Sequence, residues 1–195
     1  MDDGAIIRAS LRDGAAFGEV FERHFEAVSR YARSRVGEAA GEEIAARTFL
    51  IAFEKRHRFD AKATSSRPWL FGIATNLIRH HDRDERIHLA ALGRLPHTLV
   101  EPDPNDDPAR LDAYRLRGVL RDALLGLSAG DRDAFLLNVL GDLTYEEVAA
   151  GLGIPVGTVR SRIHHARKAL REQIARVVET DGWTADADDG TTSQG

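Results

Sequence analysis

Apolar residues recur every three or four positions along most of this chain, which is the spacing of one face of an α-helix. In the first third, this pattern predicts one helix over Ala15 to Val36 and a second over about Glu42 to His57. The short polar segment from Asp60 to Arg67 predicts a loop. Pro68, a residue suited to a first helical turn, predicts the start of a third helix that continues to about Arg86. Because no alternating strand pattern occurs, we expect an all-α protein.

An acidic and proline-rich segment divides the chain into two parts. Residues 93–112 hold four prolines and five acidic residues against two arginines, which is the composition of a flexible linker. We therefore expect one small helical domain at 1–92 and a second at 113–178. Residues 179–195 contain five acidic residues and neither lysine nor arginine, and they predict a disordered acidic tail.

The second domain is also predicted to be helical. Apolar spacing predicts a helix over Leu116 to Leu127. Ser128 followed by Asp131 resembles a capping box, and it predicts the start of another helix that runs to Leu140.

The segment from Leu143 to Leu170 has the pattern of a helix-turn-helix. Thr144 and Glu147 stand at capping-box spacing before a short helix, Gly153 permits a tight turn, and Pro155 opens a second helix. Four apolar residues of this second helix share one face that is expected to pack inward: Val159, Ile163, Ala166 and Leu170. The outward face is basic, as in a helix that enters the major groove of DNA, although a helical hairpin with a solvated basic face has the same pattern.

Charge is unevenly distributed along the chain. The net charge is only −4, from 27 basic and 31 acidic residues, so the total does not indicate a nucleic-acid-binding protein. Residues 156–176, however, hold six basic residues against one acid, and the acidic tail cancels this excess in the total. The local excess favours DNA binding by the second domain.

The helix that begins at Pro68 combines aromatic and basic residues. Trp69 and Phe71 precede Asn76 and Arg79 on one helix, next to a polar loop. Aromatic rings can stack on unpaired bases while arginines follow the backbone, so this combination suits single-stranded nucleic acid. Core aromatics followed by a solvated, charged helix end would give the same pattern, and both interpretations remain open.

Other kinds of chemistry find little support in the sequence. The chain has no cysteine, which excludes disulfides and thiolate catalysis. Two pairs of metal-type ligands, His80 with Asp84 and His81 with Glu85, belong to no longer motif. We therefore expect no metal site, no cofactor and no enzyme activity. No apolar run approaches the roughly 20 residues that a membrane helix needs, so we expect a cytoplasmic protein without membrane insertion.

Four segments together resemble an extracytoplasmic-function (ECF) sigma factor of bacterial RNA polymerase. They read FGEVFERHFEAVSRYARSRV, GEEIAARTFLIAFEKRHRF, RPWLFGIATNLIRHHDRDER and LTYEEVAAGLGIPVGTVRSRIHHARKALR. The resemblance spans about Ala15 to Gln173 and implies that the first domain is similar to region two of the family and the second to region four. It implies a protein that binds core polymerase and directs promoter-specific initiation without making or breaking a bond.

The resemblance also implies a role for individual residues. The residues implied to contact the clamp helices of the largest polymerase subunit are Glu43, Arg47, Leu50 and Glu54. Those implied to capture the melted minus-ten strand are Lys62, Ser65, Arg67, Trp69, Asn76, Arg79, His80 and Arg83. Those implied to recognise the minus-thirty-five element are Thr158, Arg160, Ser161, Arg162, His164, His165, Arg167 and Lys168. The polymerase flap region and an anti-sigma factor are further partners that the resemblance implies.

The chain departs from the family pattern at two places. Glu43, Ala46 and Arg47 stand where the family often has Asp, Gln and Glu, so Arg47 reverses a charge in the clamp-binding helix. His165 stands where arginine is common. Because neutral imidazole cannot make the bidentate contact with guanine, we expect an altered or weaker preference at one base of the minus-thirty-five element.

Three rival hypotheses remain at this point. The chain could be a free-standing helix-turn-helix transcription regulator that binds duplex DNA without polymerase. It could be a helical metal-dependent hydrolase that uses the histidine and acid pairs. It could also serve mainly as a docking partner for an inhibitory protein, which is compatible with the sigma-factor interpretation.

Overall fold

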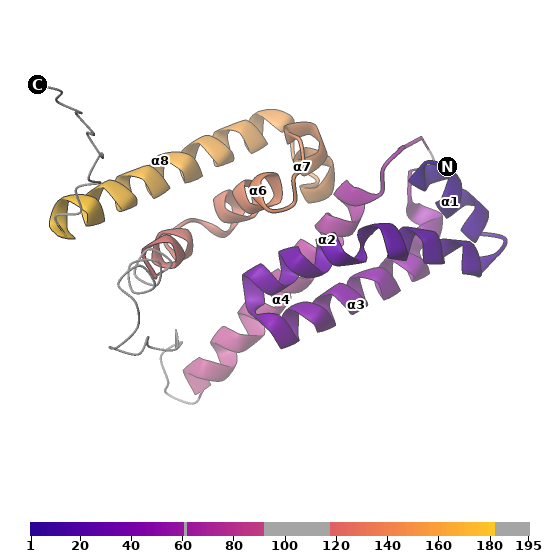
Figure 1. Cartoon of the computed structure of the whole chain (residues 1–195), viewed down its shortest axis with the longest axis horizontal. Helices are drawn as coiled ribbons and strands as arrows, with labels where there is room; N and C mark the ends of the chain where they lie inside the picture. The colour runs from indigo at the N-terminus through magenta and orange to yellow at the C-terminus, as the bar shows by residue number, and fades with distance from the viewer. Residues whose placement is uncertain (61, 92–117, 182–195) are drawn as a thin grey trace, which may run out of the picture.

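The computed structural model describes residues 1–60, 62–91 and 118–181. In this part of the chain every regular element is a helix, which confirms the predicted all-α class (Figure 1). The linker predicted at 93–112, the start of the helix predicted from Leu116, and tail residues 182–195 lie outside the described residues.

The N-terminal group contains four α-helices and two short 3-10 turns. They are α1 (Asp3–Ser10), η1 (Gly14–Phe17), α2 (Gly18–Val36), α3 (Glu38–Lys55), η2 (Arg56–Arg58) and α4 (Arg67–Ala91). The helices predicted from Ala15, from about Glu42 and from Pro68 correspond to α2, α3 and α4. No helix is predicted before Ala15, so α1 is an addition to the predicted fold.

A shared apolar core fixes these helices to one another. Tyr31 of α2, Ala45 of α3 and Leu70 of α4 are each fully buried in it. Helix α1 is docked through Ile6 and Ile7, each only 1% exposed, because its apolar residues are adjacent and turn toward the same core.

The C-terminal group contains the helix-turn-helix. Residues 118–125 are helical, followed by α6 (Ala129–Val139), α7 (Tyr145–Leu152) and α8 (Val156–Asp181). Thr144 and Glu147 form the predicted capping box at the start of α7. Gly153 ends that helix with φ of 65°, a left-handed conformation that glycine adopts without strain. The four apolar residues predicted to face inward on α8 are all buried: Val159, Ile163, Ala166 and Leu170.

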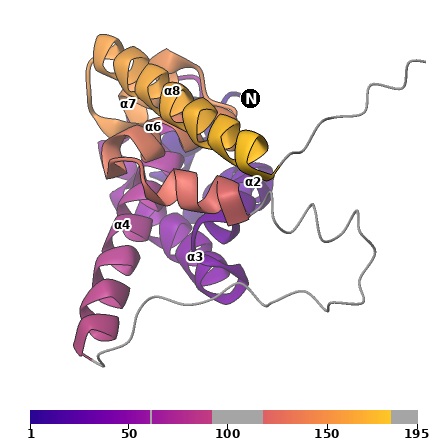
Figure 2. The same cartoon turned by 90° about the vertical axis from the view of Figure 1, so that its left-hand side faces the viewer.

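The two groups pack against each other, and their buried residues form one continuous cluster. Figures 1 and 2 show α6, α7 and α8 as a single group beside α2 and α4. The backbones of α4 and α7 approach each other closely, because a Cβ added at Gly72 would lie 2.3 Å from the carbonyl oxygen of Gly151. Only glycine at position 72 permits this backbone contact, which brings the helix-turn-helix against the aromatic and basic helix.

Candidate nucleic-acid interface

The outward face of α8 carries most of the residues predicted to contact duplex DNA. Six of them are exposed: Arg160, Ser161, His164, His165, Arg167 and Lys168. Thr158 and Arg162 are half-buried, and the guanidinium of Arg162 lies against Gly130 of α6. The buried stripe on the opposite side of α8 orients this face, so the inward packing of the helix determines which side chains can reach DNA.

Two of these α8 side chains have partners, one on a neighbouring helix and one on α8 itself. Arg167 donates to the side-chain oxygen of Asn138 on α6 at 3.3 Å. Lys168 lies 3.9 Å from Glu172 on its own helix. Both cations remain exposed, so their charge is available to phosphate groups.

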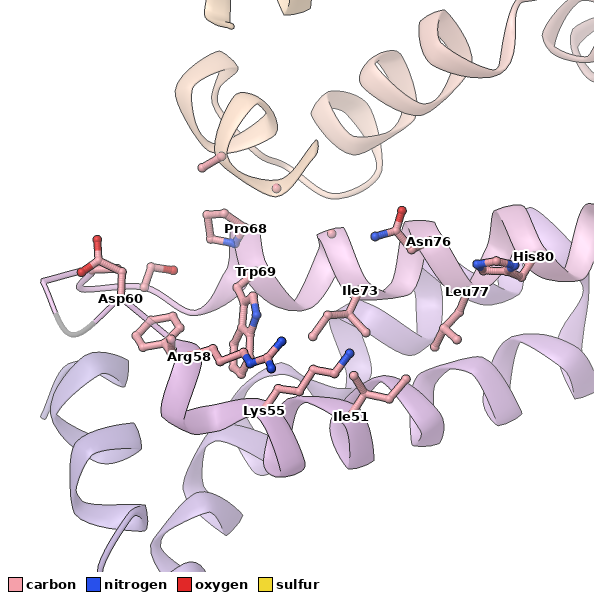
Figure 3. Close-up of a pocket in the computed structure, with 16 residues that line it drawn as sticks. Ile51, Lys55, Arg58, Asp60, Pro68, Trp69, Ile73, Asn76, Leu77 and His80 are labelled. Atoms are coloured by element: carbon pink, nitrogen blue, oxygen red, sulfur yellow. The ribbon is translucent and has the colours of Figure 1, made fainter. Parts of the chain in front are cut away.

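A pocket of about 650 Å³ lies where the loop after η2 meets α3 and α4 (Figure 3). Trp69 and Ile73 of α4 are directed toward α3 in this view, whereas Asn76 is directed toward the α7 side. The ring of Phe59 packs against Trp69 with 5.2 Å between centroids. Lys55 and Arg58 add positive charge to the lining. The pocket therefore combines an aromatic surface, an amide and cations, which are the groups that bind an unpaired base and its phosphate.

The pocket collects four of the eight residues predicted to bind the minus-ten strand. Those in its lining are Ser65, Trp69, Asn76 and His80. Lys62 and Arg83 are exposed outside the lining. Ala150 and Gly151 of α7 form the facing wall. In this arrangement the helix-turn-helix therefore lies over the pocket that is predicted to bind a strand.

The remaining two predicted residues, Arg67 and Arg79, reach across to the C-terminal group. Arg67 donates to the carbonyl oxygen of Gly141 at 2.7 Å. Arg79 donates to the carboxylate of Asp133 on α6 at 2.6 Å. Both guanidinium groups thus hold the two groups together here, and both would have to leave these partners to contact a strand.

Asp133 is the centre of a buried polar cluster that sequence reasoning did not single out. Its side chain is 1% exposed and also accepts a hydrogen bond from Arg35 of α2 at 2.8 Å. Arg35 in turn donates to the hydroxyl of Tyr31, which lies 3.0 Å from the hydroxyl of Thr75. The available signal was position, because Asp133 precedes Leu137 by four residues and so shares its inward face.

The environment of this cluster shifts the acidity of two members. Burial raises the pKa of Tyr31 above its ordinary value, which keeps the phenol neutral. Burial alone would lower the pKa of Arg35, but the oxygens of Tyr31 and Asp133 outweigh it and raise the pKa. Arg35 is therefore a buried, permanently charged group that depends on Asp133 for a counter-ion.

The α3 residues predicted to contact core polymerase form an exposed stripe. Glu43, Arg47, Leu50 and Glu54 all lie on the outer face of this helix. Leu50, the large apolar side chain of this stripe, is 58% exposed between charged neighbours. Arg47, the charge reversal, lies 3.8 Å from Glu43, so the two side chains form an ion pair within the helix.

The described residues also bear on the expected absence of a metal site and of a membrane-spanning helix. Among them, no group of three or more histidine, aspartate and glutamate side chains is arranged to hold a metal ion. In that part of the chain, no helix is both long and apolar enough to cross a bilayer.

A helix-turn-helix with a basic outer face, joined to a helical group with an aromatic and basic pocket, defines an all-helical DNA-binding transcription factor. Comparison with known proteins narrows this class. The family profile described as Sigma-70 region 2 matches residues 20–87, and that described as Sigma-70, region 4 matches residues 117–170. The chain is 32% identical over 183 residues to the ECF RNA polymerase sigma factor RpoE of Cereibacter sphaeroides, covering 88% of this chain and 94% of that protein.

A second relative and two solved structures are also similar to this chain. The ECF RNA polymerase sigma factor SigL of Mycobacterium tuberculosis is 30% identical over 165 residues, covering 84% of this chain and 91% of the relative. The solved structure of CnrH in complex with the cytosolic domain of CnrY superposes with a TM-score of 0.63 at 26% identity, covering 92% of this chain and 98% of that one. The sigma factor RpoE of Bartonella quintana, in complex with the anti-sigma factor NepR, gives 0.61 at 25% identity, covering 82% and 96%.

The chain belongs to the ECF family of RNA polymerase sigma factors. It is therefore a DNA-binding protein of transcription initiation that works with core RNA polymerase and promoter DNA. The free-standing regulator is not favoured, because the matched regions include region 2 as well as the helix-turn-helix.

Proposed function

We propose that this sigma factor divides promoter recognition between its two helical groups. Residues 1–92 act as the region that binds core polymerase and the minus-ten strand, 113–178 read the minus-thirty-five element, 93–112 link them, and 179–195 form an acidic tail. The protein acts in the cytoplasm by binding alone, and it makes or breaks no bond. The observation that carries the proposal is the pairing of the exposed basic face on α8 with the aromatic and basic pocket at α4.

The pocket is proposed to take an unpaired base of the non-template strand. Trp69 supplies the aromatic surface, and Asn76 supplies an amide that can both donate and accept hydrogen bonds. Because Gly151 of α7 lines the facing wall, strand binding requires the two groups to separate. Separation would also release Arg67 and Arg79 from Gly141 and Asp133, and their guanidinium groups could then contact phosphates.

The exposed stripe on α3 is proposed to contact the clamp helices of the largest polymerase subunit. Leu50 would be the apolar anchor, and Glu43, Arg47 and Glu54 the charged rim around it. The ion pair between Glu43 and Arg47 lowers the effect of the charge reversal, because Arg47 already has a carboxylate beside it.

An anti-sigma factor is a further proposed partner. Two similar solved structures hold their chains with such a protein or with a cytosolic partner domain, namely NepR and the cytosolic domain of CnrY. A partner that bound the packed form of this chain would keep the pocket behind α7 and would oppose the separation that strand binding requires.

Replacing Asn76 with alanine is expected to weaken binding of the minus-ten strand. Loss of one base contact should lower the affinity of the polymerase holoenzyme for fork-junction DNA by about tenfold, since such contacts are worth roughly 1–3 kcal/mol. Binding to duplex DNA that contains only the minus-thirty-five element is the internal control and should not change. Equal affinity of wild type and Asn76→Ala for fork-junction DNA would contradict the assignment of this pocket.

A further inference from the structure

Helix α1 lies behind the loop that forms one wall of the pocket. Ala63 and Ser65 of this loop face the pocket, together with Asp60. On the other side, a Cβ added at Gly4 of α1 would lie 2.3 Å from the carbonyl oxygen of Ala63. Helix α1 precedes residues 20–87, which the region 2 profile matches, so this support comes from outside the matched region.

The buried carboxylate of Asp3 joins α1 to the end of the loop. Its Oδ2 accepts hydrogen bonds from the backbone N–H and the hydroxyl of Ser66, both at 2.8 Å. The backbone N–H of Asp3 donates to the carbonyl oxygen of Thr64 at 3.1 Å. Three positions in the second half of the loop, 63, 64 and 66, therefore touch Asp3 or Gly4.

Helix α2 completes the surroundings of this carboxylate. His24 Nε2 lies 2.7 Å from Oδ2, and Arg23 donates to Oδ1 at 3.3 Å. Burial alone would raise the pKa of Asp3, but the hydrogen bonds from Ser66 and the charge of His24 outweigh it and lower the pKa. The carboxylate is thus held as an anion with several donors, an arrangement that fixes its position and that of Ser66.

Ser66 transmits this fixed position to the pocket. It is fully buried and directly precedes α4, and its carbonyl oxygen accepts the N–H of Leu70 at 2.9 Å in the first turn. Pro68 and Trp69, which line the pocket, lie within that turn. A shift of Ser66 would therefore move one wall of the pocket and its aromatic surface together.

We propose that α1 is a positioning element for the captured base: Asp3 and Gly4 hold residues 63–66 in the shape that accepts an unpaired nucleobase of the non-template strand. Asp3 is a positioning residue here and touches no DNA. The inference rests on the proposed function of the pocket. It deepens that function by assigning base capture partly to a helix outside the matched region.

The test uses full-length chain bound to core RNA polymerase and a fork-junction DNA selected by the wild-type holoenzyme from a randomised pool. The single-stranded minus-ten segment is then made abasic at one position at a time. The readout at each position is the affinity for intact DNA divided by the affinity for abasic DNA. This ratio reports base capture, whereas a general loss of stability would lower both affinities together.

Two variants change the loop by different means. Asp3→Asn removes the charge while keeping the size of the side chain, and Gly4→Ala adds the Cβ that would meet Ala63 while leaving every side chain of the Asp3 cluster in place. Asp3→Asn is expected to reduce the ratio at the captured position about tenfold, given the strength of charge-assisted hydrogen bonds. Gly4→Ala is expected to reduce the ratio at the same position, because the backbone at Ala63 must shift to make room for the added Cβ. Asp13→Ala is the matched control, because that exposed carboxylate caps η1 through Ala15 and does not touch the loop.

The possible outcomes distinguish a failure of the role proposed for α1 from a failure of the base-binding role proposed for the pocket. A reduced ratio in both variants, with an unchanged ratio in Asp13→Ala and unchanged binding to minus-thirty-five duplex, supports the inference. If wild type discriminates against an abasic position and both variants match it, the inference is overturned while the pocket assignment stands. If wild type discriminates at no position, the pocket assignment fails and the inference fails with it. Should Asp3→Asn not fold, Gly4→Ala decides between these outcomes.

Discussion

Replacing Asp133 with alanine is expected to separate the two helical groups. The substitution leaves Arg35, whose side chain is 5% exposed, as a buried cation without its carboxylate. Removing one partner of a buried ion pair costs about 3–5 kcal/mol. Separation of the groups would return Arg35 to water, so we expect this cost to be relieved by opening rather than by global unfolding.

Energy transfer between two dyes measures this opening directly. The natural chain has no cysteine, so Glu22→Cys on α2 and Arg171→Cys on α8, both at exposed positions, give two unique labelling sites. Asp133→Ala should lower the transfer efficiency in the free protein. Asp131→Ala is the matched control, since Asp131 lies on the same helix and the described residues include no ion pair that uses it. Equal transfer in Asp133→Ala and wild type would show that this cluster does not hold the packed form.

Replacing Arg160 with alanine is expected to abolish most of the sequence preference for the minus-thirty-five element. Arg160 is exposed near the start of α8, where the early residues of a recognition helix reach base edges. A bidentate arginine contact with guanine is worth roughly 1–3 kcal/mol, so affinity for the selected sequence should fall by up to about 100-fold. Selection of bound sequences by the holoenzyme from a randomised duplex, followed by affinity measurement, checks this result.

Two other variants of α8 give comparisons for the loss of sequence preference expected in Arg160→Ala. Lys168→Ala should weaken binding equally for all sequences and reduce the salt dependence by the equivalent of about one phosphate contact. His165→Arg should strengthen the preference for guanine at one base, since it restores the bidentate donor. Identical selected motifs from Arg160→Ala and wild type would contradict the assignment of this face to base recognition.

Local sequence signals were sufficient for the elements of the C-terminal group. The capping box at Thr144, the tight turn at Gly153 and the inward-facing stripe on α8 were all predicted, because each depends on residues within a few helical turns. The combination of aromatic and basic residues on α4 was also visible in the sequence, but two interpretations of it remained open, and the pocket that α4 forms with α3 and the loop was not predicted. The helix-turn-helix features alone follow from local spacing.

The features that the sequence did not predict depend on contacts between distant segments. Asp133 and Arg35 are 98 residues apart, and no local pattern shows that one neutralises the other. Asp3 and Ser66 are separated by 63 residues, and α1 is too short for its apolar spacing to define a face. The contact of Gly72 with Gly151 likewise becomes visible only when the two groups are packed together.

We expect this chain to give core RNA polymerase its promoter specificity. The most direct test mixes purified full-length chain with bacterial core polymerase, at more than one salt concentration, on a library of promoter fragments. The expected result is co-elution with core enzyme and transcription from start sites that share two spaced upstream motifs. Failure to bind core polymerase, while selected duplex DNA is still bound, would contradict this role and would show instead a free-standing regulator.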